Sequence, residues 1–131
     1  MSVIRKVWGN CHKISRLDNT EIDLLYLEKN SACSVHHHKE KINRFILISG
    51  RVTINSDLGA YTLQLNEPFD VDPNIKHQFV AFEDSVMIEI AYVKDGKIDN
   101  KDIVRDVQGG KFIDGEFKTL DELRDNNWLG L

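Results

Sequence analysis

The sequence has little cysteine and no long apolar run, and both absences exclude broad classes of protein. Its two cysteines, Cys11 and Cys33, form no Cys-x-x-Cys pair and are too few for a disulfide framework. The longest apolar runs, such as residues 45–48 and 86–88, are far too short to cross a bilayer, and the N-terminus has no apolar signal-peptide core. We therefore expect a cytosolic protein that makes no membrane contact and keeps both thiols unpaired.

A cluster of basic residues is also missing. The chain has 17 Lys and Arg against 21 Asp and Glu, which gives a formal net charge of -4, and basic residues are not interleaved with aromatic ones. This balance argues against a surface that binds DNA or RNA. With 131 residues, 41% of them hydrophobic and 29% charged, the chain suits a single domain over residues 1–131 with an adequate core.

What the sequence does contain is a series of short segments in which apolar and polar residues alternate. Alternation with a period of two is typical of strands with one buried face. Residues that favour turns, such as Asn, Asp, Gly and Pro, separate the segments. The predicted strands are 21–27, 51–55, 60–65, 77–82 and 86–93. This cadence predicts an antiparallel β-sandwich or barrel whose two sheets span about residues 20–93.

The tail, residues 109–131, departs from this pattern. Gly109-Gly110 interrupts the alternation, and residues 119–122 (Thr-Leu-Asp-Glu) form a capping-box signature. We therefore predict a short helix from residue 119 to about Asn126. Leu120, Leu123 and Trp128 would form one apolar stripe on it, which packs against the end of the barrel or against a neighbouring subunit.

The residues with the clearest chemistry are His36-His37-His38 and a later histidine, His77. On a strand alternate side chains share a face, so His36 and His38 point to one place while His37 points away. A third imidazole from another strand would complete a three-nitrogen metal site of the open, catalytic type. The triplet lies far from both termini, which argues against a tag remnant, and a solvated turn is the other interpretation.

The order of these residues resembles the cupin family. The first cupin motif, which contains His-x-His, Glu and Gly, aligns with residues 36–50, and the second, Pro-x-Gly-x-x-His, aligns with residues 73–77. The resemblance implies an all-β fold, the cupin double-stranded β-helix or jelly-roll barrel, with a short C-terminal helix. It also implies a divalent metal ion held by His36, His38, Asn43 and His77.

A closer resemblance is to the cupin domain of type II mannose-6-phosphate isomerases. Trp8-Gly9 is similar to an early Trp-Gly of that family, residues 36–39 (His-His-His-Lys) to its His-His-His-Arg, and residues 102–105 to its Asp-Ile-Val-Arg. The resemblance implies a metal-dependent isomerase whose partner is a small molecule, a sugar or sugar phosphate. Lys39 then stands where the family has an arginine and, like Arg105, orients an anionic substrate.

The sequence departs from these motifs at several positions. Asn43 replaces the metal-binding glutamate, and its amide oxygen is a weaker, neutral ligand. Glu40, on a turn that is longer than in the isomerases, either supplies the missing carboxylate or is a solvated residue. Asn30 and Asn74 stand where the motifs have glycine, and asparagine tolerates the left-handed backbone nearly as well.

The ligand types restrict the metal without identifying it. Three imidazoles with an amide or carboxylate oxygen suit Zn, Mn, Fe or Ni. Such an ion polarises a sugar oxygen, and aldose–ketose interconversion also needs a base beside the carbonyl. Glu89 is the candidate base. Its side chain either lines a pocket or faces solvent, and solvent is favoured because the more continuous apolar face of its strand is the other one. That face consists of Val86, Ile88, Ile90 and Tyr92.

Three functions stay open at this point: a metal-dependent sugar isomerase, a non-catalytic cupin that binds a metal or small ligand, and a metal-free epimerase of nucleotide-linked sugars. The last would need a His–Asp base pair, which the sequence does not reveal. We also expect a homodimer, because open sheet edges need covering. The exposed-looking N-terminal segment would supply an edge strand through Val3, Ile4, Val7 and Trp8.

Overall fold

The computed structural model describes residues 2–125, which form two sheets and one helix, α1 (Leu120–Asp125). The six-stranded sheet has the order β1 (Val3–Lys6), β2 (Gly9–Arg16), β3 (Thr20–Leu27), β11 (Ser85–Tyr92), β6 (Ile42–Ser49) and β9 (Phe69–Val71). The eight-stranded sheet follows the path β12 (Val104–Val107), β5 (Val35–His37), β10 (His77–Ala81), β4 (Ser31–Ala32), β13 (Gly110–Ile113) and β14 (Glu116–Thr119). Beside β10 it adds β7 (Val52–Ser56), and beside β7 it adds β8 (Gly59–Thr62).

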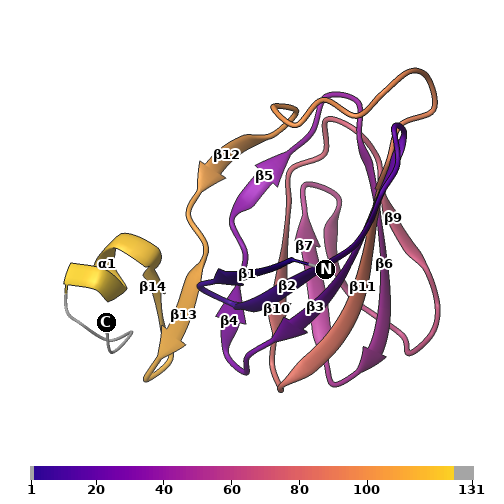
Figure 1. The fold of residues 1–131 in the computed structure, drawn as a ribbon. Helices are drawn as coiled ribbons and strands as arrows, with labels where there is room; N and C mark the ends of the chain where they lie inside the picture. Colours follow the sequence, from indigo (N-terminus) through magenta and orange to yellow (C-terminus); the bar gives the residue numbers. More distant parts are fainter. Residues whose placement is uncertain (1, 126–131) are drawn as a thin grey trace.

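The two sheets curve around a common interior and form a barrel (Figure 1). The five predicted strands are present as β3, β7, β8, β10 and β11, although β8 ends at Thr62 rather than at residue 65. Both sheets also take in strands from outside residues 20–93, because β1 and β2 extend one sheet and β12, β13 and β14 extend the other. Alternation did not reveal β2 because one of its cavity-lining side chains, Lys13, is charged.

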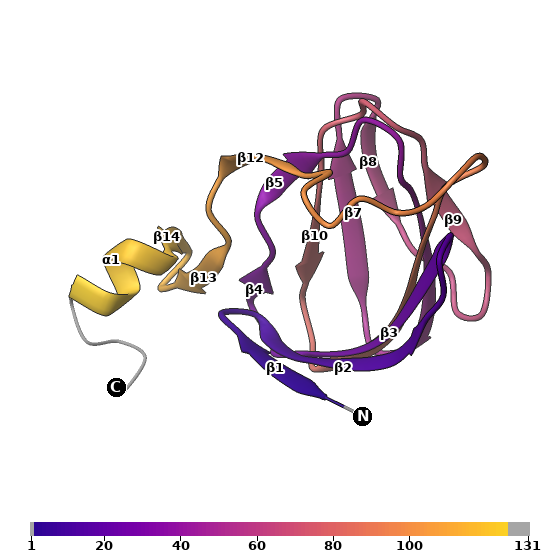
Figure 2. The same cartoon turned by 45° about the horizontal axis from the view of Figure 1, so that its top comes forward.

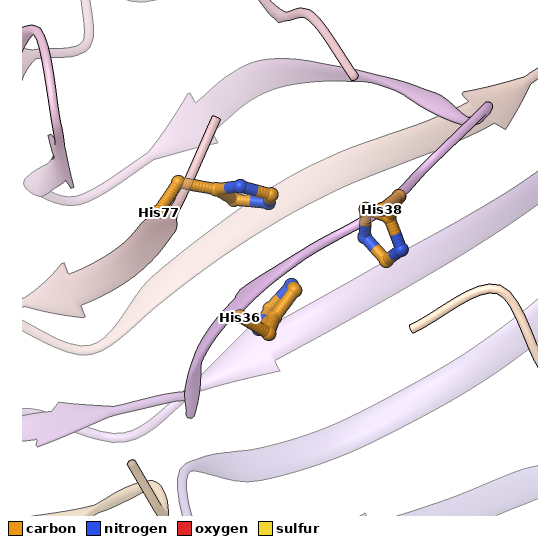
Figure 3. Close-up of side chains that lie close together, drawn as sticks. All are labelled: His36, His38 and His77. Atoms are coloured by element: carbon orange, nitrogen blue, oxygen red, sulfur yellow. The ribbon is translucent and has the colours of Figure 1, made fainter. Parts of the chain in front are cut away.

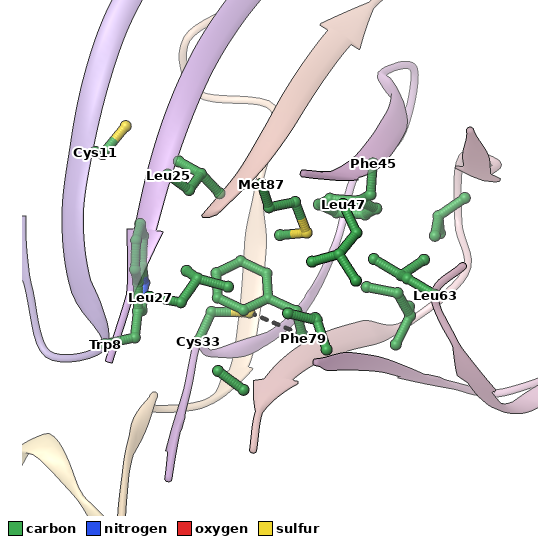
Figure 4. Close-up of a cluster of buried hydrophobic side chains, with 14 residues drawn as sticks. Trp8, Cys11, Leu25, Leu27, Cys33, Phe45, Leu47, Leu63, Phe79 and Met87 are labelled. Carbon is green, nitrogen blue, oxygen red and sulfur yellow. Dashed lines mark hydrogen bonds between the residues drawn. The ribbon is translucent and has the colours of Figure 1, made fainter. Parts of the chain in front are cut away.

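One end of the barrel interior is filled by apolar side chains (Figure 4). Leu25, Met87 and Leu47 lie side by side on β3, β11 and β6, and each is at most 1% exposed. The ring of Trp8 packs edge-on against that of Phe79, with 5.2 Å between centroids. This core fixes which face of each strand points inward.

The core gives β11 the opposite orientation to the one expected from the sequence. Met87 and Glu89 point inward, whereas Ile88 and Ile90 lie on the outer face. The expectation that Glu89 faces solvent is therefore wrong. Both faces of this strand are largely apolar, and the large inward residues of its two neighbours decide between them.

The N-terminal segment is used within its own chain. β1 pairs with β2, and Trp8, only 8% exposed, belongs to the core, with Ile4 and Val7 packed against it. The expectation that this segment is exposed is thus wrong except at Val3. Gly9, at φ 143°, allows the close approach to β3, where any side chain would collide with the carbonyl oxygen of Tyr26.

Asparagine takes the place of glycine in two turns, as predicted. Asn30 and Asn74 have φ values of 61° and 67°, in the left-handed region that asparagine tolerates better than most residues. The backbone N–H of Asn74 donates to the carbonyl oxygen of His38 at 2.6 Å. This turn therefore connects the segment before His77 to the strand that carries the other two histidines.

The C-terminal elements β13, β14 and α1 extend outside the barrel (Figure 2). The predicted capping box is present: the hydroxyl of Thr119 accepts from the backbone N–H of Glu122, whose carboxylate accepts from the backbone N–H of Thr119. Leu123 of α1, which packs on β13 and β14, is fully buried. Asn126, the predicted end of the helix, and Trp128 of the predicted stripe lie outside the described residues. Within residues 2–125 no helix has the length and apolar character needed to cross a membrane.

Candidate metal centre

Three histidines from two strands of the eight-stranded sheet meet inside the barrel (Figure 3). His36 lies on β5 and His38 follows it directly, whereas His77 opens β10 and is paired with His36 across the ladder. Each offers a ring nitrogen within 4.8 Å of the other two. The predicted convergence of these three side chains is confirmed.

Backbone carbonyl groups hold all three rings in one tautomer. The Nδ1–H of His36 donates to Ser34 O at 2.9 Å, that of His38 to Asp102 O at 2.6 Å, and that of His77 to Ile75 O at 2.9 Å. A carbonyl oxygen only accepts hydrogen bonds, so each Nδ1 carries the proton and each Nε2 keeps a lone pair. Histidine ligands of metals show this pattern, since the outer hydrogen bond fixes the ring and raises its basicity.

The three imidazoles are neutral at pH 7. Burial lowers the pKa of His36 to about 3 and that of His38 to about 4, because the charged form loses its hydration inside the barrel. Burial also lowers the pKa of His77. Neutral imidazole is the form that binds a metal.

Asn43, on β6, completes this group. It is 2% exposed, and its Nδ2 lies 3.3 Å from His38 Nε2, 3.4 Å from His77 Nε2 and 3.2 Å from Glu89 Oε2. The amide has only two hydrogens for these three acceptors. Its Oδ1 is buried and has no hydrogen-bond partner among the described residues. Asn43 thus lies where the motif resemblance placed it, with one polar atom unsatisfied.

Asp102 supports the site from outside, a role that sequence reasoning did not assign. Besides its carbonyl bond to His38, its carboxylate accepts backbone N–H bonds from Lys39 at 2.6 Å and from Glu40 and Lys41 at 3.0 Å each. These bonds hold the turn between β5 and β6 and lower the pKa of the Asp102 carboxyl below its ordinary value, although partial burial opposes them. The Asp-Ile-Val-Arg run at residues 102–105 was the sequence feature that could have pointed to this role of Asp102.

His36 and His38 border a cavity of about 710 Å³ that also reaches the inner faces of β2, β3 and β11. This volume falls in the range typical of small-molecule sites. Besides His36, His38 and Asn43, its lining includes Glu89, Lys41, Arg105, Asp23, Cys11 and Cys33. Candidate metal ligands and other titratable side chains thus line the same cavity.

Glu89 joins this hydrogen-bond network through the Asn43 amide, which donates to its Oε2 at 3.2 Å. Removal from bulk water, together with the charge of Asp23 directly opposite on β3, raises the pKa of Glu89 to about 7. Asp23 itself is paired with Arg16 at 2.6 Å. Two carboxyl groups thus face each other across adjacent strands, and only Asp23 has a strong cationic partner.

The other candidates from the sequence occupy different positions. Lys39 and Glu40 are exposed on the turn and do not line this cavity, which agrees with the interpretation of Glu40 as a solvated residue. Lys41, two residues after Lys39, lines it instead. His37 points outward, as predicted, and lies 3.4 Å from Asp106. This is a His–Asp pair, but it lies outside the cavity.

Neither cysteine joins the metal ligands. Both thiols are free and buried. Cys33 Sγ accepts the backbone N–H of Phe79 at 3.2 Å, and burial raises the thiol pKa well above its ordinary value. Burial and the charge of Asp23 raise the pKa of Cys11 to about 11. Both side chains are therefore protonated and poorly nucleophilic at pH 7.

No protein-family model matches the sequence, and no curated protein is significantly similar to it. Solved structures do match. Pac13, a nucleoside dehydratase from Streptomyces, superposes with a TM-score of 0.68 at 9% identity over 82% of this chain and 85% of its own. A Klebsiella pneumoniae protein with a double-stranded β-helix domain gives 0.61 at 11% identity, over 79% and 83% of the two chains. The cupin domain of Schizosaccharomyces pombe Cnp3 gives 0.60 at 10% identity, over 66% and 64%.

This chain has the cupin fold. The identities are low, so the match defines the architecture, and the chemistry depends on the residues themselves. In this cupin barrel the donor set fits a metal ion. Three Nε2 lone pairs converge, and a half turn of the Asn43 amide about its Cβ–Cγ bond would direct the unpartnered Oδ1 toward them. Three imidazoles and one oxygen suit Zn, Mn, Fe or Ni.

Alanine substitutions test the three ligands. His36→Ala, His38→Ala and His77→Ala should each abolish stoichiometric binding of zinc, manganese or nickel by calorimetry, because losing even an outer hydrogen-bond partner costs about 10- to 100-fold in affinity. His37→Ala is the matched control and should keep most of the binding, because this side chain points outward. Equal losses at 37 and 38, or no metal binding by the wild type, would contradict the site.

Substitution of Asn43 tests whether the fourth position of the site is a metal ligand. Asn43→Glu should strengthen binding of a divalent ion by about tenfold or more, because it adds an anionic oxygen beside the imidazoles. Without metal the same variant should have a lower melting temperature, since the new carboxyl lies beside that of Glu89. Calorimetry and thermal unfolding measure the two effects. A variant that binds metal no better than the wild type would show that position 43 is not a ligand.

Proposed function

We propose that the protein is a metal-dependent isomerase of a small sugar or sugar phosphate. The observation that carries this proposal is the placement of Glu89, a partly buried carboxyl group that forms no ion pair among the described residues. It lines the same cavity as two of the three converging imidazoles, His36 and His38. A carboxyl group whose pKa is raised to about 7 lies near the operating pH of an enzyme and is suited to accepting and returning protons. The short motifs shared with type II mannose-6-phosphate isomerases also favour this reaction.

Different groups in the cavity would carry out the polarisation, proton-transfer and positioning parts of this reaction. A bound divalent ion supplies Lewis-acid polarisation of the sugar carbonyl. Glu89 removes the proton from the carbon beside the carbonyl and returns it to the former carbonyl carbon, while the hydroxyl proton moves between the two oxygens. In the arrangement of this structure the Nδ2–H of Asn43 donates to Glu89 Oε2 at 3.2 Å and holds the carboxyl beside the histidines. The half turn that directs Oδ1 toward a metal ion would release the carboxyl for the reaction. The product is the ketose or aldose isomer, and no oxidant or reductant is required.

Two other functions are weaker. A metal-free epimerase would need a His–Asp pair facing its substrate, and His37–Asp106 lies outside the cavity. A non-catalytic binding protein would leave the placement of Glu89 unexplained. Pac13 binds uridine in the same fold, which supports a small-molecule ligand for this cavity.

A test of the enzyme proposal compares Glu89→Gln with Glu40→Gln. Metal-loaded wild type should interconvert at least one aldose–ketose pair from a panel of hexoses, pentoses and their phosphates, followed by NMR in deuterated water. Glu89→Gln should lower kcat by about 100-fold or more, because general-base catalysis contributes that much, with metal affinity kept. Glu40→Gln, on the exposed turn, should behave as wild type. Metal binding without turnover of any pair would favour the non-catalytic alternative.

We also infer a homodimer, formed through the outer face of the six-stranded sheet. The inverted orientation of β11 puts Ile88 on this face, directly between Leu24 of β3 and Ile46 of β6. Tyr26 and Ile48 continue the surface at 43% and 42% exposure. A standard interface covers about 800 Å² per partner, roughly a tenth of this chain's 7613 Å². A second copy offers the same apolar strip, and the neighbouring Arg44 on β6 is paired with Asp70 at 2.8 Å, so a two-fold pairing would bury no unpaired charge.

Light scattering coupled to gel filtration tests this dimer at micromolar concentration. Ile88→Lys should convert dimer to monomer, because it buries a charge at the centre of the face. Leu58→Lys, at a residue 82% exposed in the turn between β7 and β8, is the control and should stay dimeric. A monomeric wild type would refute the dimer.

A cytosolic location also remains a prediction, supported by the two free thiols.

A further inference from the structure

A row of three ionisable side chains crosses the inner face of the six-stranded sheet. Lys13 of β2 pairs with Asp23 of β3, and Asp23 pairs with Glu89 of β11, so the three residues are direct neighbours in the register. All three line the cavity. Charged side chains seldom occupy a protein interior unless they are paired or functional. Glu89 is the proposed base, so Lys13 and Asp23 need an explanation of their own.

The row lies where the inner face of this sheet changes from apolar to polar. Two residues away on β3 and β11, the inward positions are Leu25 and Met87, each at most 1% exposed. The histidines lie on the other sheet, and both sheets enclose the same interior (Figure 1). A molecule that contacts the histidines therefore has this row on the cavity wall formed by the other sheet.

Asp23 is held in place as an acceptor. Arg16 donates to its Oδ1 at 2.6 Å and also pairs with Glu21 at 3.0 Å. Arg16 is not among the residues that line the cavity, so this ion pair leaves acceptor positions of Asp23 facing the interior. The thiol of Cys11 also bonds Asp23, but a thiol is a weak donor that a hydroxyl group can replace.

Lys13 provides donors beside this acceptor. It forms no ion pair with a carboxylate among residues 2–125, and its ammonium group has three N–H donors. Each of the two side chains repels an ion of its own sign, so together they suit a neutral polar group. A hydroxyl group both donates and accepts, and it can bond Asp23 and Lys13 at the same time.

We propose that Lys13 and Asp23 form a hydroxyl-binding subsite that selects the sugar by bonding a hydroxyl group on a carbon beyond the two that react. The inference rests on the proposed function and deepens it by naming residues that determine which sugar binds. The reacting carbons lie at the metal centre and Glu89, so the hydroxyl groups left for this pair belong to the next carbons. A site built to bond a hydroxyl group discriminates against the analogue that lacks it, because its polar groups then stay unpaired.

The experiment measures binding of glucose, mannose and their 3-deoxy and 4-deoxy analogues to the metal-loaded protein by ligand-observed NMR titration. At least one parent sugar should bind about tenfold or more tightly than one of its own deoxy analogues. Asp23→Ala and Lys13→Met should each bring this ratio of affinities close to one by weakening the parent sugar alone. A merely structural role would weaken parent and analogue equally and leave the ratio unchanged.

Two matched controls remove the same kinds of charge from other positions. Glu21→Ala removes the other partner of Arg16, and Lys6→Met removes a lysine that lines the cavity from β1. Both should keep the ratio of the wild type. Metal affinity and melting temperature, measured on every variant, separate these results from misfolding.

Three results would overturn the subsite. The first is a wild type that binds the deoxy analogues as tightly as the parent sugars, or binds none of these sugars. The second is an equal fall of the ratio in Glu21→Ala or Lys6→Met, which would reflect the general field of the cavity. The third is an unchanged ratio in Asp23→Ala and Lys13→Met, which would place the discriminating contact elsewhere.

The subsite and the isomerase proposal fail in different ways. Discrimination between parent and deoxy sugars without turnover of any sugar would leave the subsite standing and remove the isomerase. Turnover of both deoxy analogues as fast as that of the parent sugar would do the reverse.

Discussion

The hydrogen bonds from three imidazole Nδ1–H groups to backbone carbonyls are the interaction on which the rest of the site depends. They fix each ring, and they assign the lone pair to the nitrogen that faces the cavity. Two of the carbonyls belong to residues two positions before their histidine, Ser34 and Ile75, so the backbone just before β5 and β10 supplies them locally. The third belongs to Asp102, 64 residues after His38, and only the folded barrel brings it there.

Much of the fold and the convergence of the three histidines could be predicted from the sequence, because both depend largely on short-range periodicity. Alternation located five strands, and the same period of two put His36 and His38 on one face and His37 on the other. Asn30 and Asn74 were recognisable as substitutes for glycine, since the left-handed backbone restricts those turns to few residue types. The capping box at Thr119 was equally local.

The parts that could not be predicted depend on long-range packing. Alternation shows that β11 has two faces but not which one the barrel encloses, and with apolar residues on both, the choice fell to Leu25 and Leu47 on its neighbours. Glu89 was therefore placed in solvent. Lys41 was overlooked in favour of Lys39 because motif alignment follows chain position, whereas the cavity lining depends on how the turn is held by Asp102.

The histidine strand itself is held weakly to its neighbour. β5 has three residues, and its ladder with β10 contains one residue pair, His36 with His77. An ion coordinated by residues 38 and 77 would close a loop of about 40 residues, the kind of long-range closure that removes conformational freedom chiefly from the unfolded chain. In this barrel the metal would then act as a cross-link between two strands that the backbone joins poorly, and folding and metal binding would be thermodynamically coupled.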